Sequence, residues 1–480
     1  MLKIMLQYIP YDTDVAFLRV KQDVIDVPFY KLAFFTHVYT TMTVLVAGFT
    51  QFSSVIRRKI PEVHRVSGWM YAVIVVLLAG PSGFYMGVYA NGGIISQTAF
   101  CTLAILWIFF TIMAVVKAIQ RNFTSHRMFI ICSFALTLSA ITLRAWKFGI
   151  VYFLHPRPMD VYHIVSWLGW VPNLLIAVLI INKFNIKKMR KLIFLLPLFI
   201  FFSCSKQDKN ATGNNVDKKE TVKEDAKSLD KKDNNGNSTG KIFGMYTGDF
   251  EALKYKETGE FVYSNKITIS LDSTAGDTFY GHSVAAGNSR PFKGSYKLNN
   301  GIYNVEAAEP GDDKYDGKFS FAVYTDSIMG IWKANNTNLD VSERKYTLKR
   351  KEFRYSPDTE LPEELAGALL YQKNQEDFDK GEYLTKDILK VNPSKKLLTK
   401  QDVENMHTGD LEVIRNSIFA RHGYSFKTRK MRYIFDQYVD WYMPVSDDVR
   451  SQLTDIEQKN VELLKRYEEH STKYYDAYGR

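Results

Sequence analysis

Cysteine is scarce in this 480-residue chain: there are three, and none follows Cys204. Cys101 and Cys132 lie inside apolar segments, and Cys204 is the only cysteine outside them. A disulfide framework is therefore excluded from the polar second half of the chain. Cys204 remains free for another covalent modification.

A basic face for nucleic acid is also missing, although the formal net charge is +11. The Lys and Arg residues cluster beside apolar segments, as membrane topology requires, and form no single basic face. Residues 242–352 contain neither a nucleophile–base pair nor a phosphate-binding loop. These absences exclude nucleic acid as the expected partner. They favour a non-enzymatic role, with no catalytic residue assigned, and leave the question of an enzyme open.

Long apolar runs are confined to the first part of the chain. Residues 29–204 are dense in apolar and aromatic side chains, whereas residues 205–480 are polar and charged. Crossing a bilayer takes about 20 apolar residues. The sequence therefore predicts an all-α transmembrane bundle of five helices over residues 29–188, after an N-terminal segment at 1–28. The five apolar segments lie at about 30–52, 66–90, 97–118, 127–152 and 161–182.

Positive charge alternates along the connections between these segments. Lys and Arg concentrate in the connections 53–65 and 117–127 and in the segment 182–191. The intervening connections, 90–96 and 155–160, carry no charge or little net charge. Because Lys and Arg gather on the cytoplasmic side, we expect a bundle in the inner membrane with its N-terminal segment outside.

The stretch MRKLIFLLPLFIFFSC at residues 189–204 has the order of an export signal: a basic end, a short apolar run and a small residue before cysteine. It resembles the lipobox of bacterial lipoproteins, which implies cleavage and lipidation of Cys204. Alternatively it stays uncut as a short sixth membrane segment, with a length that is marginal for a span. Residues 205–241 are expected to form a flexible tether. Residues 204–480 would then be periplasmic or lipid-anchored at an outer face.

Four histidines of the predicted bundle are candidate ligands of haem b. His64 and His126 stand in His-Arg pairs where helices enter from the cytoplasm, and His37 and His163 lie toward the outer side. Imidazoles on facing helices can ligate haem iron, and ionisable groups at membrane depth are often functional. The alternatives need no cofactor: interfacial anchoring by His64 and His126, a loop position for His163, and a helix–helix hydrogen bond from His37. No other metal ligand is assigned.

Three blocks of the first half carry a resemblance to a known family: FLRVKQ, GFTQFSSVIRRKIPEVHRVSGWMY and LWIFFTIMAVVKAIQRNFTSHRMFIICSFALTLSAITLRAW. They resemble a family of predicted bacterial membrane proteins, domain-of-unknown-function family 2306. The resemblance covers about residues 15–183 and implies a compact helical membrane domain in which His64, His126 and Arg144 are typical, with no established activity. Arg144 and Lys147, near the outer end of the fourth helix, either meet an anionic group or extend their charges toward the interface.

An alternation of polar and apolar residues begins near residue 242. KITISL, KFSFAVY and KYTLKR show the period of two that is typical of half-buried strands. Turn signals recur about every ten residues. Eight candidate strands over residues 242–352 predict a small antiparallel β-barrel or sandwich.

Residues 353–396 look helical and acidic, and we expect them to connect the β domain to a last domain at 397–470. Three amphipathic stretches there predict a small three-helix α domain, and Thr454 with Glu457 has the spacing of a capping box. IRNSIFARHGYSF, WYMP and LTDIEQKNVELLKRYE resemble the YARHG domain, with Phe419 in place of the tyrosine of its name. The resemblance implies an extracellular or envelope location and does not imply catalysis.

Arg421 and His422 belong to the motif that names this family, and they are candidate binding residues. Arg421 could clasp a carboxylate of cell-wall material or of a partner. Alternatively both are structural, with Arg421 paired to an internal acid such as Glu457 and His422 at a helix C-terminus. A tail at 471–480 follows.

The sequence thus predicts a membrane-anchored bacterial envelope protein with a lipid bilayer as its first partner. Its exported half is expected to be an interaction module for cell-wall polymer or another envelope protein. The alternative is a transmembrane redox protein that uses b-type haem.

Overall fold

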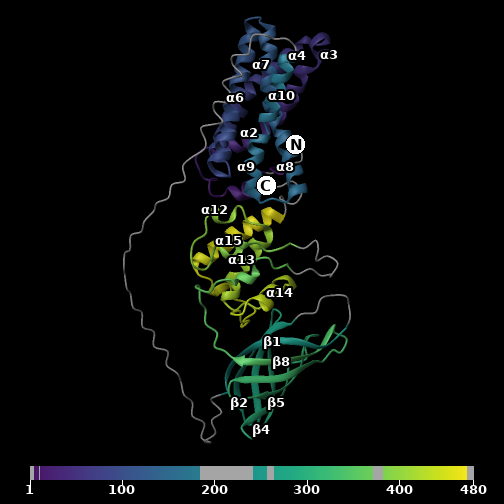
Figure 1. The fold of residues 1–480 in the computed structure, drawn as a ribbon, viewed down its shortest axis with the longest axis vertical. Helices are drawn as coiled ribbons and strands as arrows, with labels where there is room; N and C mark the ends of the chain where they lie inside the picture. The colour runs from purple at the N-terminus through teal and green to yellow at the C-terminus, as the bar shows by residue number, and fades with distance from the viewer. Residues whose placement is uncertain (1–4, 10, 184–241, 257–263, 371–381, 473–480) are drawn as a thin grey trace, which may run out of the picture.

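Figure 1 shows three parts along the long axis of the molecule: a bundle of helices at one end, a β-barrel at the other, and a helical domain between them. We call them the membrane bundle (29–183), the β-barrel (242–352) and the helical domain (353–472). The computed structural model describes residues 5–9, 11–183, 242–256, 264–370 and 382–472.

The export-signal-like segment 189–204, with Cys204, lies outside the described residues, as does the tether 205–241. Cleavage and lipidation of Cys204 therefore remain predictions.

The membrane bundle has four helical segments long and apolar enough to cross a bilayer, or five when a pair bent by 41° counts as one span. The five segments correspond to the five predicted spans. The second span contains a π-helical turn, Ile74–Ala79, just before Pro81, which supplies no backbone N–H to the helix. The helices are α2 (Tyr30–Phe52), α3 (Ser54–Lys59), α4 (Pro61–Val73), α5 (Gly80–Val88), α6 (Gly93–Ile119), α7 (Phe123–Thr137), α8 (Ser139–Leu154), α9 (Pro158–Leu168) and α10 (Val171–Lys183).

The two ends of the bundle differ in their connections. The end that faces the helical domain, here called the docking end, carries the short connections 89–92 and 155–157. The opposite end carries the connections between α2 and α4 and between α6 and α7, where the basic clusters of the sequence lie. A 3-10 turn, Ala16–Lys21, precedes α2 at the docking end.

The β-barrel is closed, and each of its eight strands pairs antiparallel with its neighbours in sequence, so the predicted barrel or sandwich is a barrel. Inward and outward side chains alternate: Phe319, Phe321 and Val323 are buried, whereas Lys318 and Ser320 are exposed. The strands are β1 (Gly244–Tyr255), β2 (Asn265–Ala275), β3 (Thr278–Ala285), β4 (Asn288–Asn299), β5 (Ile302–Ala308), β6 (Gly317–Val323), β7 (Ser327–Ala334) and β8 (Val341–Arg350). Pairing of β1 with β8 closes the barrel.

The helical domain is built around α13 and α15, which pack against each other. Thr454 and Glu457 form the predicted capping box at the start of α15. Gly423 follows α13 with φ +74°, and a Cβ there would lie 2.4 Å from Val445, so both conformation and space require glycine. The helices are α12 (Lys400–Val403), α13 (Thr408–Arg421), α14 (Arg429–Tyr438) and α15 (Asp455–His470).

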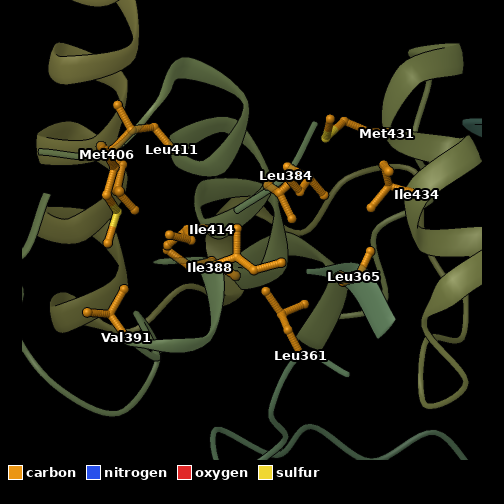
Figure 2. Close-up of a cluster of buried hydrophobic side chains, with 14 of the residues drawn as sticks. Leu361, Leu365, Leu384, Ile388, Val391, Met406, Leu411, Ile414, Met431 and Ile434 are labelled. Atoms are coloured by element: carbon orange, nitrogen blue, oxygen red, sulfur yellow. The ribbon is translucent and has the colours of Figure 1, made fainter. Parts of the chain in front are cut away.

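Residues 353–396 differ from the helical connector that the sequence predicts. Their described part holds only 3-10 turns and an isolated bridge, and most of its aliphatic side chains are buried in the core of the helical domain. Figure 2 shows Leu361, Leu365 and Leu384 beside Ile414 of α13. The composition favours a helix, but Pro362 interrupts it. The segment is therefore part of the domain rather than a bridge to it.

Candidate functional site

A cavity of about 300 Å³ lies inside the membrane bundle, toward the docking end. Its walls come from α2, α5, α6, α7, α8 and α9 and from the 3-10 turn, and most of the lining is apolar, with Met42 and Trp107 among it. Three lining side chains are basic, namely Lys21, His37 and Arg144, and none of the lining residues is acidic.

Backbone irregularity holds the His37 ring at this cavity. Its Nδ1 donates to the Ala79 carbonyl at the end of the π-helical turn, 2.9 Å away, which leaves Nε2 without a hydrogen-bond partner among the described residues. A Cβ at Gly83 would lie 2.9 Å from the ring, so glycine lets α5 approach it. Arg144 donates to the carbonyl of Ala140, one turn back on α8, and its charge acts on His37.

A network of hydroxyl groups closes the deep end of the cavity. The Tyr71 hydroxyl bonds to Ser133 Oγ at 2.8 Å and to Thr137 Oγ1 at 2.7 Å. Trp107 Nε1 donates to Thr137 Oγ1 at 3.0 Å, and Thr111 Oγ1 bonds to Ser133 Oγ at 2.7 Å. These buried polar groups satisfy one another, and they tie α4, α6 and α7 together in the apolar interior.

The other candidate histidines lie apart from the cavity. At the opposite end of the bundle, His126 Nδ1 donates to the Ala114 carbonyl at 2.8 Å, and His64 Nδ1 is buried without a partner among the described residues. The two rings are close enough to act on each other electrostatically. At the docking end, His163 Nε2 bonds to the Gly92 carbonyl at 2.8 Å, and His163 does not line the cavity. The structure thus brings His64 and His126 together but does not place His163 beside His37 in this cavity.

The helical domain binds the docking end through polar contacts. Asn405 Oδ1 accepts from the Met159 amide at 2.8 Å, and this amide lies in the first turn of α9, where the helix supplies no acceptor. Lys400 donates to Asn91 Oδ1 in the α5–α6 connection. The helical domain therefore caps a membrane helix as well as contacting a loop.

The N-terminal segment is part of the same interface. Lys21 is 1% exposed and donates to the Tyr89 carbonyl. Burial, and then the charge of Lys400, lower the pKa of Lys21 to about 7. Val20 lies in the core of the helical domain, and Arg19 forms an ion pair with Glu469 of α15. Residues 16–21 therefore join the membrane bundle to the helical domain.

Arg421 and His422 are both buried in the helical domain. Arg421 donates from Nε and Nη2 to the Thr359 carbonyl, at 2.9 and 2.7 Å, and from Nη1 to Ser417 Oγ at 2.8 Å. Its guanidinium lies over the Trp441 ring, 5.6 Å from the centroid. These contacts occupy the fork that a ligand carboxylate would use, which favours the structural role.

The internal acid Glu457 pairs with His422, rather than with Arg421 as the structural alternative expected. His422 Nε2 lies 2.7 Å from Glu457 Oε2, and its ring stacks on Tyr355 with centroids 4.3 Å apart. Glu457 also accepts from Thr454 and from the Tyr355 hydroxyl. Burial opposes its charge, but the hydrogen bonds from His422 and Thr454 outweigh burial and lower the Glu457 pKa to about 2.

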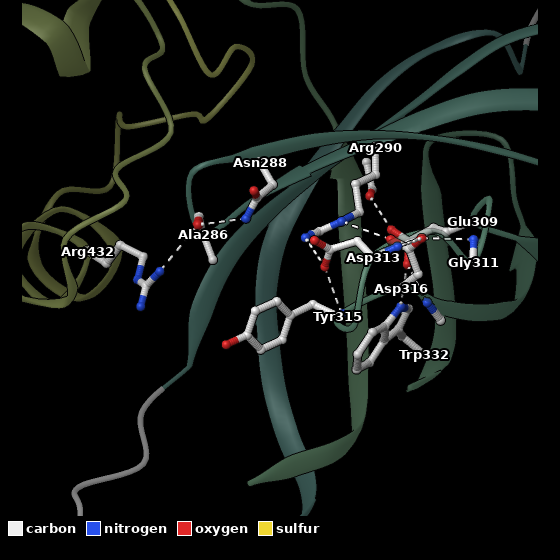
Figure 3. Close-up of polar contacts among 12 residues, drawn as sticks. Ala286, Asn288, Arg290, Glu309, Gly311, Asp313, Tyr315, Asp316, Trp332 and Arg432 are labelled. Atoms are coloured by element: carbon white, nitrogen blue, oxygen red, sulfur yellow. Dashed lines mark hydrogen bonds and ion pairs between the residues drawn. The ribbon is translucent and has the colours of Figure 1, made fainter. Parts of the chain in front are cut away.

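Hydrogen bonds also fix the β-barrel to the helical domain. The Gly287 amide donates to Ser425 Oγ at 2.9 Å. Arg432 donates to the Ala286 carbonyl at 3.3 Å, a contact drawn in Figure 3. On the neighbouring strand β2, whose Ile267 pairs with Ala285, Lys266 Nζ donates to the Val439 carbonyl at 2.7 Å.

Beside these contacts the barrel holds a closed polar cluster, also drawn in Figure 3. Glu309 is 6% exposed and accepts from Ser283, the Gly317 amide and Trp332 Nε1. Arg290 pairs with Asp316 at 3.1 Å. The charged side chains of the cluster are paired or hydrogen-bonded within it, and the cluster joins β3, β6 and β7. We therefore interpret it as structural.

Two family models match the chain. Residues 34–181 match the family described as predicted membrane protein (DUF2306), and residues 387–469 match the YARHG domain. Both resemblances predicted from the sequence are confirmed. No curated protein and no solved structure matches the chain.

The DUF2306 match contains His37, Arg144 and most of the cavity lining, and the YARHG match contains Arg421 and His422. Lys21, which lines the cavity from outside the DUF2306 match, was not predicted as a site residue. Its only signal in the sequence was its place in FLRVKQ, a block that resembles the family. Asn405 and Lys400 carried no signal, because their partners lie more than 200 residues away in the chain.

Proposed function

We propose that this membrane-anchored protein carries its β-barrel and helical domain outside the membrane as an interaction module for cell-wall polymer. The observation that supports an outer location is the side on which the helical domain docks. It contacts Asn91 and Met159, which lie in or beside the two connections with little charge. The basic connections lie at the opposite end, as expected of a cytoplasmic face.

The module is held against the membrane bundle rather than carried only by the intervening chain. Asn405 and Lys400 bind it to the bundle, and Ser425 and Arg432 bind the barrel to it. Exposed barrel tyrosines support a polymer ligand, because an aromatic ring offers a flat apolar face on which a sugar ring can lie. They include Tyr280, Tyr315 and Tyr324, which are 40%, 47% and 37% exposed.

A labelling experiment tests the orientation. In intact cells, a membrane-impermeant maleimide should label Asn336→Cys, in an exposed turn of the barrel, with wild-type protein as background. Lys59→Cys, exposed at the opposite end of the bundle, should react only after permeabilisation. The reverse pattern would reject the outer location.

A sedimentation experiment tests the ligand. Full-length protein in nanodiscs should sediment with purified peptidoglycan sacculi, and Tyr280→Ala with Tyr315→Ala should weaken the binding. Tyr383→Ala, at a tyrosine of the helical domain that is 55% exposed, is the matched control. If the protein stays in the supernatant, cell-wall polymer is rejected as the ligand. An envelope protein that cross-links to the module would then be the partner instead.

Transmembrane electron transfer by b-type haem is a second candidate, and the hydrogen bonds of two histidines favour it. His37 and His126 each direct Nδ1 at a backbone carbonyl. Histidines that ligate metals are commonly held in this way, with the other ring nitrogen free for the metal. His64, buried beside His126, is the candidate second ligand at that end.

An absorption spectrum of protein from haem-replete cells tests this candidate. A Soret band that His126→Ala removes and His155→Ala retains would support it, since His155 is exposed at the end of α8. A colourless wild-type preparation would reject it.

A further inference from the structure

The cavity of the membrane bundle has an unbalanced set of charges. Arg144 and His37 line it with Lys21, and its lining contains no acidic side chain. Among the described residues Arg144 has no carboxylate partner, and its one hydrogen bond goes to a carbonyl of its own helix. A cation at membrane depth is costly unless another group balances it. Asp23 and Glu404 act on Lys21 at the docking end, but neither acts on Arg144, so the part of the cavity around Arg144 has the electrostatics of a site for an anion.

The rest of the lining selects against a small hydrophilic anion. Along α2, Tyr30 and His37 come before Leu45, so the basic residue lies nearer the docking end and the apolar wall lies deeper. Trp107 and Leu136 continue that apolar wall on α6 and α7. The polar groups of Trp107 are already bonded within the hydroxyl network. An occupant with one charged end and an apolar remainder matches both zones.

We propose that this cavity binds an anionic amphiphile, with a carboxylate or phosphate head at Arg144 and His37 and an apolar chain directed toward the bilayer centre. The guanidinium fork of Arg144 suits either head group. The head lies toward the docking end and the chain lies deeper, which is the orientation of a lipid in the leaflet on that side. Free fatty acids and lipid phosphates share this chemistry.

Lys21 extends the basic lining to the interface with the helical domain. Its Nζ donates to the Tyr89 carbonyl, and the nearby Lys400 belongs to the helical domain. A bound anion at Arg144 would therefore share its cavity with Lys21, which takes part in the contact between the two domains. This site belongs to the membrane bundle and does not depend on what the β-barrel binds.

Native mass spectrometry of the full-length protein in a non-ionic detergent tests the proposal with three probes of equal chain length. Oleate carries a carboxylate, 1-oleoyl lysophosphatidic acid carries a phosphate, and oleyl alcohol carries no charge. We expect one copy of an anionic probe to bind roughly tenfold to a hundredfold more tightly than the alcohol, because hydrogen bonds to charged groups are stronger. Preference for oleate or for the phosphate identifies the source.

Arg144→Gln should lower the affinity for the preferred anionic probe to that for oleyl alcohol. Arg57→Gln, which removes the same charge from the opposite end of the bundle, is the matched control and should change nothing. Arg144→Lys keeps the charge without the fork and should fall between them. Ala140→Phe, which fills the cavity, should reduce binding of all three probes.

Two results would overturn the proposal. One is equal binding of the three probes to the wild-type protein. The other is equal affinity of Arg144→Gln and Arg57→Gln for the anionic probes. If Arg144→Gln does not fold, Arg144→Lys and Ala140→Phe decide in the same way: wild-type affinity in both rejects the site.

Discussion

The membrane bundle and the helical domain each place an arginine near a histidine, and they satisfy the two side chains differently. In the helical domain, Arg421 has three hydrogen bonds to its own domain, and His422 pairs with Glu457. In the bundle, Arg144 bonds only to its own helix among the described residues, and His37 keeps one ring nitrogen unbonded.

This contrast separates residues that build a fold from residues that are ready to bind. Donors that are fully bonded inside a domain hold it together, and a ligand would have to break those bonds first. Donors that line a cavity without a partner are available to a ligand. We therefore interpret the Arg-His pair that names a family as structural here, and we propose binding capacity for the pair that comes from two helices distant in the sequence.

The largest expected effect comes from removing the partner of His422 in the helical domain. Glu457→Ala would leave His422, Tyr355 and Thr454 without their shared acceptor. Each buried donor left without an acceptor costs about 1–3 kcal/mol. We expect the helical domain of the full-length protein to lose that stability in hydrogen-exchange mass spectrometry at neutral pH.

The pH dependence of stability is the control for this variant. The folded pKa of Glu457, about 2, lies below its unfolded value. The stabilisation is therefore complete above the unfolded pKa and is lost as the pH falls through the folded pKa. Wild type and Glu457→Ala should converge toward pH 2, and a difference that does not depend on pH would show that the charge of Glu457 is not the cause.

The next effect tests whether residues 353–396 belong to the helical domain. Leu384 is 2% exposed in its core, so Leu384→Ala should destabilise the domain by about 2–5 kcal/mol. Leu397→Ala, at a side chain that is 54% exposed, should stay within about 0.5 kcal/mol of wild type. Urea unfolding followed by proteolysis measures the stability of both variants. Equal stabilities would mean that residues 353–396 are a connector and not part of the core.

A smaller effect tests the contact between the two regions. Asn405→Ala removes the acceptor of the Met159 amide, a hydrogen bond worth about 1 kcal/mol. We expect faster hydrogen exchange in the first turn of α9 and no change in the barrel. Asn405→Asp keeps an acceptor but places a carboxylate against Asp160, to which the Asn405 amide donates at 3.4 Å, so it should protect the Met159 amide only in part. Unchanged exchange in Asn405→Ala would mean that the contact contributes nothing.

Local periodicity explains why much of the architecture could be predicted. An apolar run of about 20 residues, or an alternation of polar and apolar residues, can be recognised within a short stretch of sequence. The five spans and the eight strands could therefore be predicted. The capping box of Thr454 and Glu457 is equally local. The prediction of a helical connector at residues 353–396 was wrong. Its acidic composition is typical of a helix, whereas Pro362 and the burial of Leu365 and Leu384 decide its structure.

The candidate sites could be predicted only as residue types. Nothing near Arg421 in the sequence indicates that the Thr359 carbonyl, 62 residues away, is its main partner. Arg144 was recognised as a cation that could meet an anion, but its place near His37 depends on α2 and α8 lining one cavity. Contacts between distant segments, such as Asn405 with Met159, have no pattern in either segment alone.

The smallest expected effect on stability comes from substituting Arg144 in the membrane bundle. Arg144 has no carboxylate partner to lose among the described residues, so Arg144→Gln should change the stability of the delipidated protein by no more than about 0.5 kcal/mol. A bound ligand stabilises the folded state by mass action, so oleate or lysophosphatidic acid should raise the Tm of wild type more than that of Arg144→Gln. A large loss of stability without ligand would instead make Arg144 a structural residue like Arg421, and the contrast between the two regions would disappear.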